Sequence, residues 1–184
     1  RAADTGKTVA VIGGGPGGMT AAYYLSLMGH QVTVYEQRPK LGGMLRYGIP
    51  DYRLPQEILD RDIDHILSAG VRVHTGVSIG RELTMEDIQK SFDAVYIAIG
   101  AHNDKKLGLE GEDSQNVISA VELLRGIGEG QVTDFTGKKV CVIGGGNVSM
   151  DATRTALRLG ADSVTCVYRR RVEDMTALSE EIEE

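Results

Sequence analysis

The sequence predicts an α/β fold in which one strand–helix–strand unit is used twice in tandem. The run Val-Ala-Val-Ile-Gly-Gly-Gly from Val9 matches Val-Cys-Val-Ile-Gly-Gly-Gly from Val140, an offset of 131, so the unit is duplicated. Strands and helices alternate along the chain, which favours a parallel sheet with helical crossovers. The 24 glycines are concentrated in residues 13–18, 42–43 and 144–146, where they mark tight backbone sites.

Each copy begins with a short β-branched strand, passes through glycines and enters an apolar helix of about 13 residues, which Gly29 or Gly160 ends. A second, parallel strand follows through a right-handed crossover, after two extra residues in the second copy. These second strands are expected at residues 31–35 and 163–168. Further elements are expected as a helix at 56–69, a strand at 71–75, a helix near 85–91, a strand at 94–99 and a helix at 120–124.

The glycine-containing segment 101–137 suits a crossing between two domains. We expect a first domain at residues 1–110 and a second at 111–184. A complete nucleotide-binding half has the order βαβαβ, and the second copy lacks a third strand in this sequence. The fold expected is therefore α/β with two Rossmann-like dinucleotide-binding units in tandem, the second incomplete, in a chain that is part of a longer protein.

Composition narrows the class of partner. The net charge is −6, which opposes binding to a phosphate backbone, and no apolar run approaches the ~20 residues that cross a bilayer. The polar N-terminus lacks a secretory signal, so we expect a cytoplasmic protein without a nucleic-acid or membrane partner. The four histidines are scattered without metal-ligand spacing, and no metal site is expected. Cys141 and Cys166 lie in apolar runs typical of buried strands and are expected to be core thiols.

The first copy carries the motif Gly13-x-Gly15-x-x-Gly18 between a strand and a helix. The first glycine permits a tight turn, the second lets backbone approach a pyrophosphate, and the third allows close helix–strand contact. The phosphates then meet free N–H groups at the positive end of the helix dipole. Glu36 ends the second strand, where its carboxylate can accept hydrogen bonds from both ribose hydroxyls. This pattern predicts a dinucleotide site and leaves FAD and NAD open.

The segment after Glu36 resembles a known family. Gly42-Gly43, then Gly-Ile-Pro from Gly48 and Arg-Leu-Pro from Arg53, is similar to the small subunit of glutamate synthase and the flavin region of dihydropyrimidine dehydrogenase. The resemblance implies FAD at the first site, with the glycine pair along the cofactor, Arg53 in contact with it and Ile79 at its adenine end. Motif and resemblance together give these cofactor residues: Gly13, Gly15, Pro16, Gly17, Gly18, Glu36, Gln37, Gly42, Gly43, Met44, Arg53, Ile79 and Gly100.

The second copy repeats the motif as Gly144-x-Gly146-x-x-Ser149, and the side chain of Asn147 is placed to cap the helix that follows. The position of Glu36 is predicted to fall at Arg169, followed by Arg170. Guanidinium groups bind a 2′-phosphate through bidentate, charge-assisted hydrogen bonds, which favours NADP, with NAD as the alternative. A solvated basic turn is the competing interpretation.

The run Gly-Gly-Gly-Asn-x-x-Met-Asp followed by Tyr-Arg-Arg resembles the NADPH domain of the same family. The resemblance implies contacts from Gly145, Gly146, Asn147, Val148, Arg169, Arg170 and Thr176. Two departures from the family are visible. Ile99 replaces the threonine that precedes Gly100 in such flavoproteins, and Thr176 stands where the family commonly has proline.

The function expected is an FAD-dependent oxidoreductase module that passes hydride or electrons between NADPH and a partner subunit or domain, as in the glutamate synthase small subunit. The family often carries an iron–sulfur region, so an iron–sulfur acceptor is a candidate. No catalytic side chain is assigned, because hydride chemistry belongs to the cofactors. A non-catalytic nucleotide-binding or partner-binding fragment is the alternative. A thioredoxin-reductase-like activity would need a C-x-x-C that this sequence lacks. The acidic run at Glu180-Glu181 is expected to be a solvated helix face.

Overall fold

The computed structural model describes residues 1–183, which have an α/β fold with parallel sheets. The chain divides into two compact units. The first comprises Arg1–Arg46 and Asp51–His102, and the second comprises Tyr47–Pro50 and the chain from Asn103 onward. Within the described residues, no helix has the length and apolar character needed to cross a membrane.

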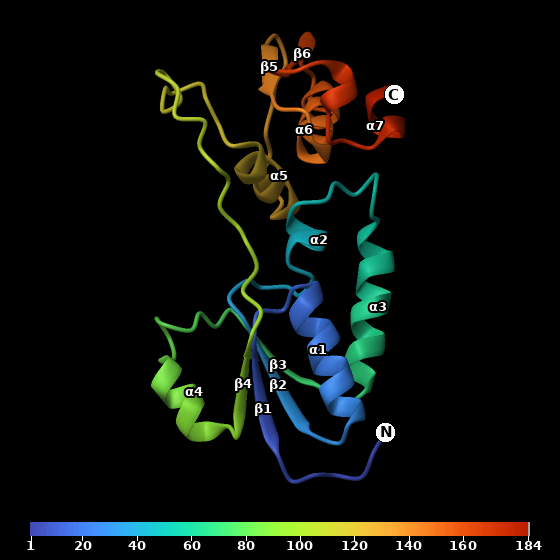
Figure 1. Cartoon of the computed structure of the whole chain (residues 1–184), viewed down its shortest axis with the longest axis vertical. Helices are drawn as coiled ribbons and strands as arrows, with labels where there is room; N and C mark the ends of the chain where they lie inside the picture. Colours follow the sequence, from blue (N-terminus) through green and yellow to red (C-terminus); the bar gives the residue numbers. More distant parts are fainter. Residues whose placement is uncertain (184) are drawn as a thin grey trace. The chain divides into compact units, whose positions relative to one another are not determined.

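The first unit is a parallel sheet of four strands in the order β3-β2-β1-β4. Helices α1 and α3 lie on one face of this sheet and α4 on the other (Figure 1). The core lies between strands β1 and β2 and the helices α1 and α3. In it, Val11, Val32 and Val34 pack against Met19 and Ala22 of α1. The elements are β1 (Thr8–Ile12), α1 (Pro16–Leu27), β2 (Gln31–Glu36), α3 (Gln56–Ser68), β3 (Arg72–Thr75), α4 (Met85–Ser91) and β4 (Ala94–Ile97).

Local sequence explains where these elements stop and start. Gly29 follows α1 with φ +91°, a conformation that suits glycine after a helix. At α4, the Thr84 side chain accepts a hydrogen bond from the Asp87 N–H while the Asp87 carboxylate accepts one from the Thr84 N–H. This reciprocal capping satisfies two backbone donors that the helix itself leaves open. The helix predicted at 85–91 is confirmed, and the strand predicted at 94–99 ends two residues early, at Ile97.

The second unit holds a parallel pair of strands, β5 and β6. Helix α6 packs against both strands, and α5 packs against α6. The predicted helix at 120–124 is longer than expected, and the short 3-10 helix at Val172–Asp174 was not predicted. The elements are α5 (Ala120–Gly128), β5 (Lys139–Ile143), α6 (Asn147–Arg158), β6 (Ser163–Val167), the 3-10 helix η1 (Val172–Asp174) and α7 (Ser179–Glu183). The short helix α2 (Met44–Tyr47) precedes them in the chain.

Strand register corrects the alignment of the two copies. Ile12 pairs with Tyr35 in the first unit, and Ile143 pairs with Val167 in the second. The second copy therefore has one extra residue before the end of its second strand, and the predicted two was wrong. Since Glu36 follows Tyr35, its structural equivalent is Tyr168, and the assignment to Arg169 was wrong. The loop that ends α6 has no periodicity from which its length could be read.

The two cysteines are exposed, so the expectation of buried core thiols was wrong for both Cys141 and Cys166. Strands β5 and β6 have only each other as strand neighbours within the described residues. Exposed and half-buried positions alternate along β5, and Ile143 at its end is 60% exposed. An apolar run was interpreted as a strand covered on both faces, whereas this pair is not covered on both faces by residues 1–183.

Candidate functional site

The first glycine loop is closed by two of its glycines. A Cβ added to Gly13 would lie 2.3 Å from the Ala98 carbonyl oxygen, and one added to Gly18 would lie 1.9 Å from the Gly13 carbonyl oxygen. Such contacts exclude any side chain at either position. These glycines therefore allow the turn after β1 and the close packing of α1 on that turn, as the motif predicts.

Gly15 and Gly17 of the same loop leave room where a side chain would stand. A Cβ on Gly17 would meet nothing within 4 Å, and one on Gly15 would come no closer than 3.7 Å to the Gly43 Cα. Helix α1 begins at Pro16 with no side-chain hydrogen bond at its N-cap and no acidic residue in its first turn. The positive end of the helix thus faces space that an anionic group can enter.

Glu36 is a buried carboxylate beside this loop. The residue is 6% exposed. Its two carboxylate oxygens accept hydrogen bonds, one from the Gly14 N–H at 2.7 Å and the other from the Arg38 N–H at 2.8 Å. The Val77 N–H donates to the Glu36 carbonyl oxygen at 3.0 Å, which brings the segment that carries Ile79 next to the end of β2. Each carboxylate oxygen has a second lone pair that a hydroxyl can still use.

The Gly42-Gly43 pair is attached to the first loop. The Gly42 N–H donates to the Gly14 carbonyl oxygen at 2.8 Å. A Cβ on Gly43, where φ is +53°, would lie 2.7 Å from the Gly15 Cα. Two segments that are far apart in sequence therefore form one glycine-lined backbone surface.

Arg46 anchors this surface to α3, a role that the sequence did not reveal. Arg46 is 4% exposed; its Nε donates to the Leu41 carbonyl oxygen, and its other nitrogens bind Gln56 Oε1 at 2.6 Å and the Asp60 carboxylate. Three acceptors from three places suit the planar fork of a guanidinium. Sequence alone shows only an arginine after Gly42-Gly43, because its acceptors are brought to it by α3.

The remaining predicted residues of the first site are less tightly gathered. Ala98 donates its N–H to the Ile12 carbonyl oxygen, which places the chain leading to Gly100 beside the first loop. Ile99 is 61% exposed. Arg53 is half-buried in the turn before α3, Met44 is half-buried in α2, and Gln37 is exposed after β2.

The second glycine loop has the same plan with different neighbours. A Cβ on Gly144 would lie 2.2 Å from Ser149 Oγ, so Ser149 packs where the first loop has Gly18. A Cβ on Gly145 would lie 2.6 Å from the ring of Tyr168. Helix α6 has no side-chain hydrogen bond at its N-cap and no acidic residue in its first turn. Its positive end, like that of α1, therefore has no acidic side chain or side-chain cap that would compete with an anion.

A segment after η1 is bound to this loop. The Thr176 and Ala177 N–H groups both donate to the Gly145 carbonyl oxygen, at 2.9 and 3.0 Å. Asn147 Oδ1 accepts from the Leu178 N–H at 3.0 Å. Its predicted role as a cap of its own helix was therefore wrong, because a backbone donor 31 residues later takes its oxygen. Thr176 is brought to the loop, with its Oγ1 3.4 Å from where a Gly146 Cβ would stand.

The basic run is exposed and unequally paired. Arg171 forms an ion pair with Asp174 at 3.2 Å. Arg169 and Arg170 are exposed, and neither takes part in an ion pair within residues 1–183. Glu181 is not on a solvated helix face as expected, because it forms an ion pair with Arg154 in which both side chains are 16% exposed.

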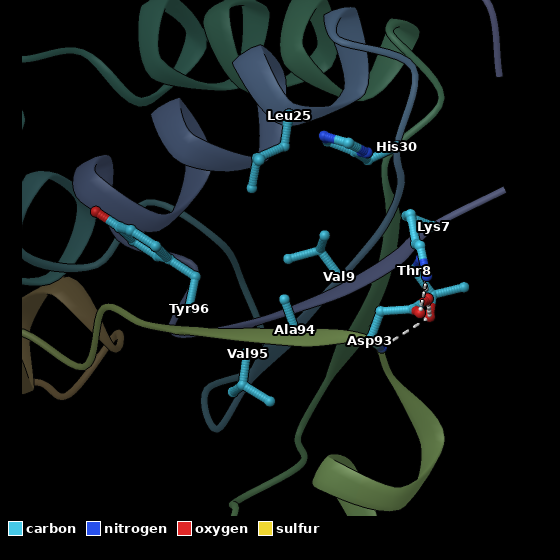
Figure 2. A pocket seen from close by; sticks show the side chains of 9 residues that line it. All are labelled: Lys7, Thr8, Val9, Leu25, His30, Asp93, Ala94, Val95 and Tyr96. Carbon is cyan, nitrogen blue, oxygen red and sulfur yellow. Dashed lines mark hydrogen bonds and ion pairs between the residues drawn. The ribbon is translucent and has the colours of Figure 1, made fainter. Parts of the chain in front are cut away.

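A separate pocket of about 480 Å³ lies toward the amino ends of β1 and β4. Figure 2 shows Leu25 and His30 above the strands that carry Val9 and Ala94, with Asp93 at one end of the pocket. Ligands of open α/β sheets bind at the carboxyl ends of the strands, where the glycine loops lie. None of the predicted cofactor residues lines this pocket, and we assign no nucleotide to it. The described residues also contain no group of side chains that could hold a metal ion.

Comparison with known proteins gives a consistent result. The model of the pyridine nucleotide-disulphide oxidoreductase family matches residues 7–184. The beta subunit of an NADP(+)-dependent formate dehydrogenase from Moorella thermoacetica is 43% identical over 183 residues, which is 98% of this chain and 26% of that protein. The glutamate synthase [NADPH] small chain of Escherichia coli (strain K12) is 36% identical over 188 residues, covering 97% of this chain and 40% of that protein.

The beta subunit of another oxidoreductase and one solved structure also match this chain. The NADPH-Fe(3+) oxidoreductase subunit beta of Geobacter sulfurreducens (strain DL-1 / KN400) is 44% identical over 176 residues, or 93% of this chain and 26% of that protein. The structure of Mycobacterium tuberculosis FprA in complex with NADPH matches with a TM-score of 0.84 at 24% identity, over 97% of this chain and 47% of that one. This likeness shows a shared fold. The resemblance predicted from sequence is confirmed, and this chain spans only part of the relatives that it matches.

Proposed function

Because this chain belongs to the pyridine nucleotide-disulphide oxidoreductase family, we propose that it is the FAD- and NADPH-binding part of an oxidoreductase that passes electrons to a partner subunit or domain. One observation carries the proposal. The two glycine loops share one plan but differ in their charged neighbours, a buried carboxylate at Glu36 and exposed guanidinium groups at Arg169 and Arg170. Such a pair suits one nucleotide with a free ribose and another with a 2′-phosphate.

The first loop fits FAD. The backbone surface at Gly15 and Gly17 leaves space where side chains would stand, and the open end of α1 suits a pyrophosphate. Glu36 lies where it can accept hydrogen bonds from ribose hydroxyls. We propose that FAD is held by Gly13, Gly15, Pro16, Gly17, Gly18, Glu36, Gln37, Gly42, Gly43, Met44, Arg53, Ile79 and Gly100.

The second loop fits NADP. The N-terminal end of α6, which has no side-chain cap and no acidic residue, suits the pyrophosphate. Arg169 and Arg170 can donate to the 2′-phosphate because no ion pair within residues 1–183 occupies them. We propose that NADP is held by Gly145, Gly146, Asn147, Val148, Arg169, Arg170 and Thr176. We also propose two nucleotide-binding domains of Rossmann type, at residues 1–110 and 111–184.

When bound, FAD supplies the chemistry, since it accepts the electron pair of a hydride from reduced nicotinamide and delivers electrons to an acceptor. The residues of this chain bind and orient: the glycine loops receive the pyrophosphates, Glu36 reads one ribose, and the arginines read the phosphate on the other. Relatives named as subunits of formate dehydrogenase and glutamate synthase support an electron-accepting partner subunit. An iron–sulfur acceptor and a cytoplasmic location complete the proposal.

Visible spectroscopy under anaerobic conditions tests this function. The purified full chain, reconstituted with FAD, is expected to show a flavin spectrum that NADPH bleaches rapidly and NADH bleaches slowly. Tightly bound FAD that survives gel filtration would support the first site independently of turnover. A chain that binds neither FAD nor NADPH would contradict the proposal and favour a non-catalytic fragment.

A further inference from the structure

The middle glycine of each loop is held by the segment that follows the second strand of its unit. In the first unit, the Gly14 carbonyl oxygen accepts a hydrogen bond from the Gly42 N–H at 2.8 Å. Its counterpart in the repeated run is Gly145, whose carbonyl oxygen accepts two, from the Thr176 N–H at 2.9 Å and the Ala177 N–H at 3.0 Å. The two units therefore fasten the same carbonyl group with segments of different sequence.

These bonds fix the direction of the peptide between Gly145 and Gly146. No peptide bond within the described residues is cis, so the Gly146 N–H points opposite to the Gly145 carbonyl, away from Thr176 and Ala177. This N–H has no acceptor within residues 1–183. If the peptide turned over, a partly negative carbonyl oxygen would face where the N–H now points. The segment from Thr176 thus keeps the loop turned as an anion requires.

A largely buried ion pair attaches this segment to α6. Arg154 of α6 binds Glu181 of α7 twice, through an ion pair with the carboxylate and a hydrogen bond from Nη2 to the Glu181 carbonyl oxygen at 3.0 Å. Both side chains are 16% exposed. Between this pair and the loop, Asn147 Oδ1 accepts from the Leu178 N–H at 3.0 Å. Residues 176–181 are therefore held at both ends, at the glycine loop and in the middle of α6.

We propose that Arg154 and Glu181 are positioning residues of the second nucleotide site: their ion pair holds residues 176–181 on α6 and so keeps the Gly145–Gly146 peptide turned toward a pyrophosphate. This inference rests on the proposed binding of NADP. Neither side chain has to touch the nucleotide. A carboxylate without a partner near the site would repel a pyrophosphate, whereas the guanidinium of Arg154 neutralises that of Glu181.

Charge reversal in the full chain tests this role. Glu181→Lys breaks the ion pair, and Glu180→Lys is its matched control, since it makes the same change of charge at the neighbouring, exposed position of α7. Isothermal titration calorimetry would measure dissociation constants for NADPH and for adenosine 2′-monophosphate, which carries the 2′-phosphate but no pyrophosphate. Flavin titration would follow the first site, and circular dichroism would confirm folding. If Glu181→Lys does not fold, Glu181→Gln and Glu180→Gln make the same comparison without an added cation.

Positioning and net charge predict opposite results for Glu181→Lys. We expect NADPH binding to weaken at least about tenfold, while the affinities for adenosine 2′-monophosphate and FAD change by less than about threefold. Glu180→Lys should leave NADPH binding unchanged or tighten it slightly, because it only adds positive charge. Equal NADPH affinities in the two variants would overturn the inference, as would equal losses for NADPH and adenosine 2′-monophosphate in Glu181→Lys. A wild-type chain that binds neither nucleotide would instead overturn the proposed NADP site itself.

Discussion

The Gly42 N–H donates a hydrogen bond to the carbonyl oxygen of Gly14 at 2.8 Å. This bond joins the loop after β1 to the loop after β2, and the carboxyl ends of neighbouring parallel strands are where an open α/β sheet binds ligands. Gly43 then lies so close to Gly15 that a side chain on Gly43 would displace the backbone of Gly15. The two loops act as one surface, and changes to their glycines should divide into those that affect folding and those that affect binding.

Gly17→Ala and Gly18→Ala form a matched pair for this division. A Cβ at Gly18 would lie 1.9 Å from the Gly13 carbonyl oxygen, so the variant should lose about 3 kcal/mol of unfolding free energy. A Cβ at Gly17 meets nothing within 4 Å and should leave stability unchanged or raise it by up to about 1 kcal/mol. The same methyl group enters the space proposed for pyrophosphate, and FAD binding should weaken about tenfold or more. Urea unfolding and flavin titration measure the two effects.

Arg46→Met should loosen the glycine surface without touching it. The variant leaves the Leu41 carbonyl oxygen without its donor and separates α2 from Asp60 of α3. The Asp60 side chain is 55% exposed, so water can solvate it once the arginine is gone. We therefore expect the free energy of unfolding to fall by about 2 kcal/mol, mostly because the Leu41 carbonyl oxygen is left unsatisfied. Arg46→Lys should recover only part of this, since an ammonium cannot reach three acceptors in the same geometry. Equal urea midpoints for wild type and Arg46→Met would argue against the anchor.

Asp93 should make the first unit sensitive to acid. Hydrogen bonds from Lys7, then from the backbone and side chain of Thr8, lower the pKa of Asp93 from 3.8 to about 2. A carboxylate with a depressed folded pKa stabilises the fold above its unfolded pKa, and this stabilisation is lost as the pH falls through the folded pKa. Wild type should therefore lose stability between pH 3.8 and about 2, and Asp93→Asn should lose less over that interval. Thermal unfolding of both proteins across this range is the measurement; parallel curves would count against the assignment.

The order of strands and helices could be predicted because the periodicity of apolar residues and the spacing of glycines depend on the local conformation of the backbone. The wrong assignments depend on distant structure. Aligning Glu36 with Arg169 assumed a length for the loop after α6 that was wrong by one residue. The strand register shows that Tyr168 is the equivalent of Glu36. Arg46 gains its role only when α3 brings Asp60 alongside. Cys141 looked buried because apolar strands usually have covered faces.

Arg169→Ala tests the phosphate-reading role of the basic run, with Arg171→Ala as its matched control. The three arginines are consecutive and exposed, but Arg171 already pairs with Asp174, whereas Arg169 and Arg170 have no ion pair within residues 1–183. A charge-assisted hydrogen bond contributes roughly 1.5–3 kcal/mol, so Arg169→Ala should weaken NADPH binding about 10- to 100-fold. NADH lacks the 2′-phosphate and should bind about equally to wild type and Arg169→Ala. Arg171→Ala should change both affinities little.

A similar loss of NADPH affinity in all three single variants, Arg170→Ala included, would mean that the run attracts anions by net charge alone, and added salt would then abolish the effect.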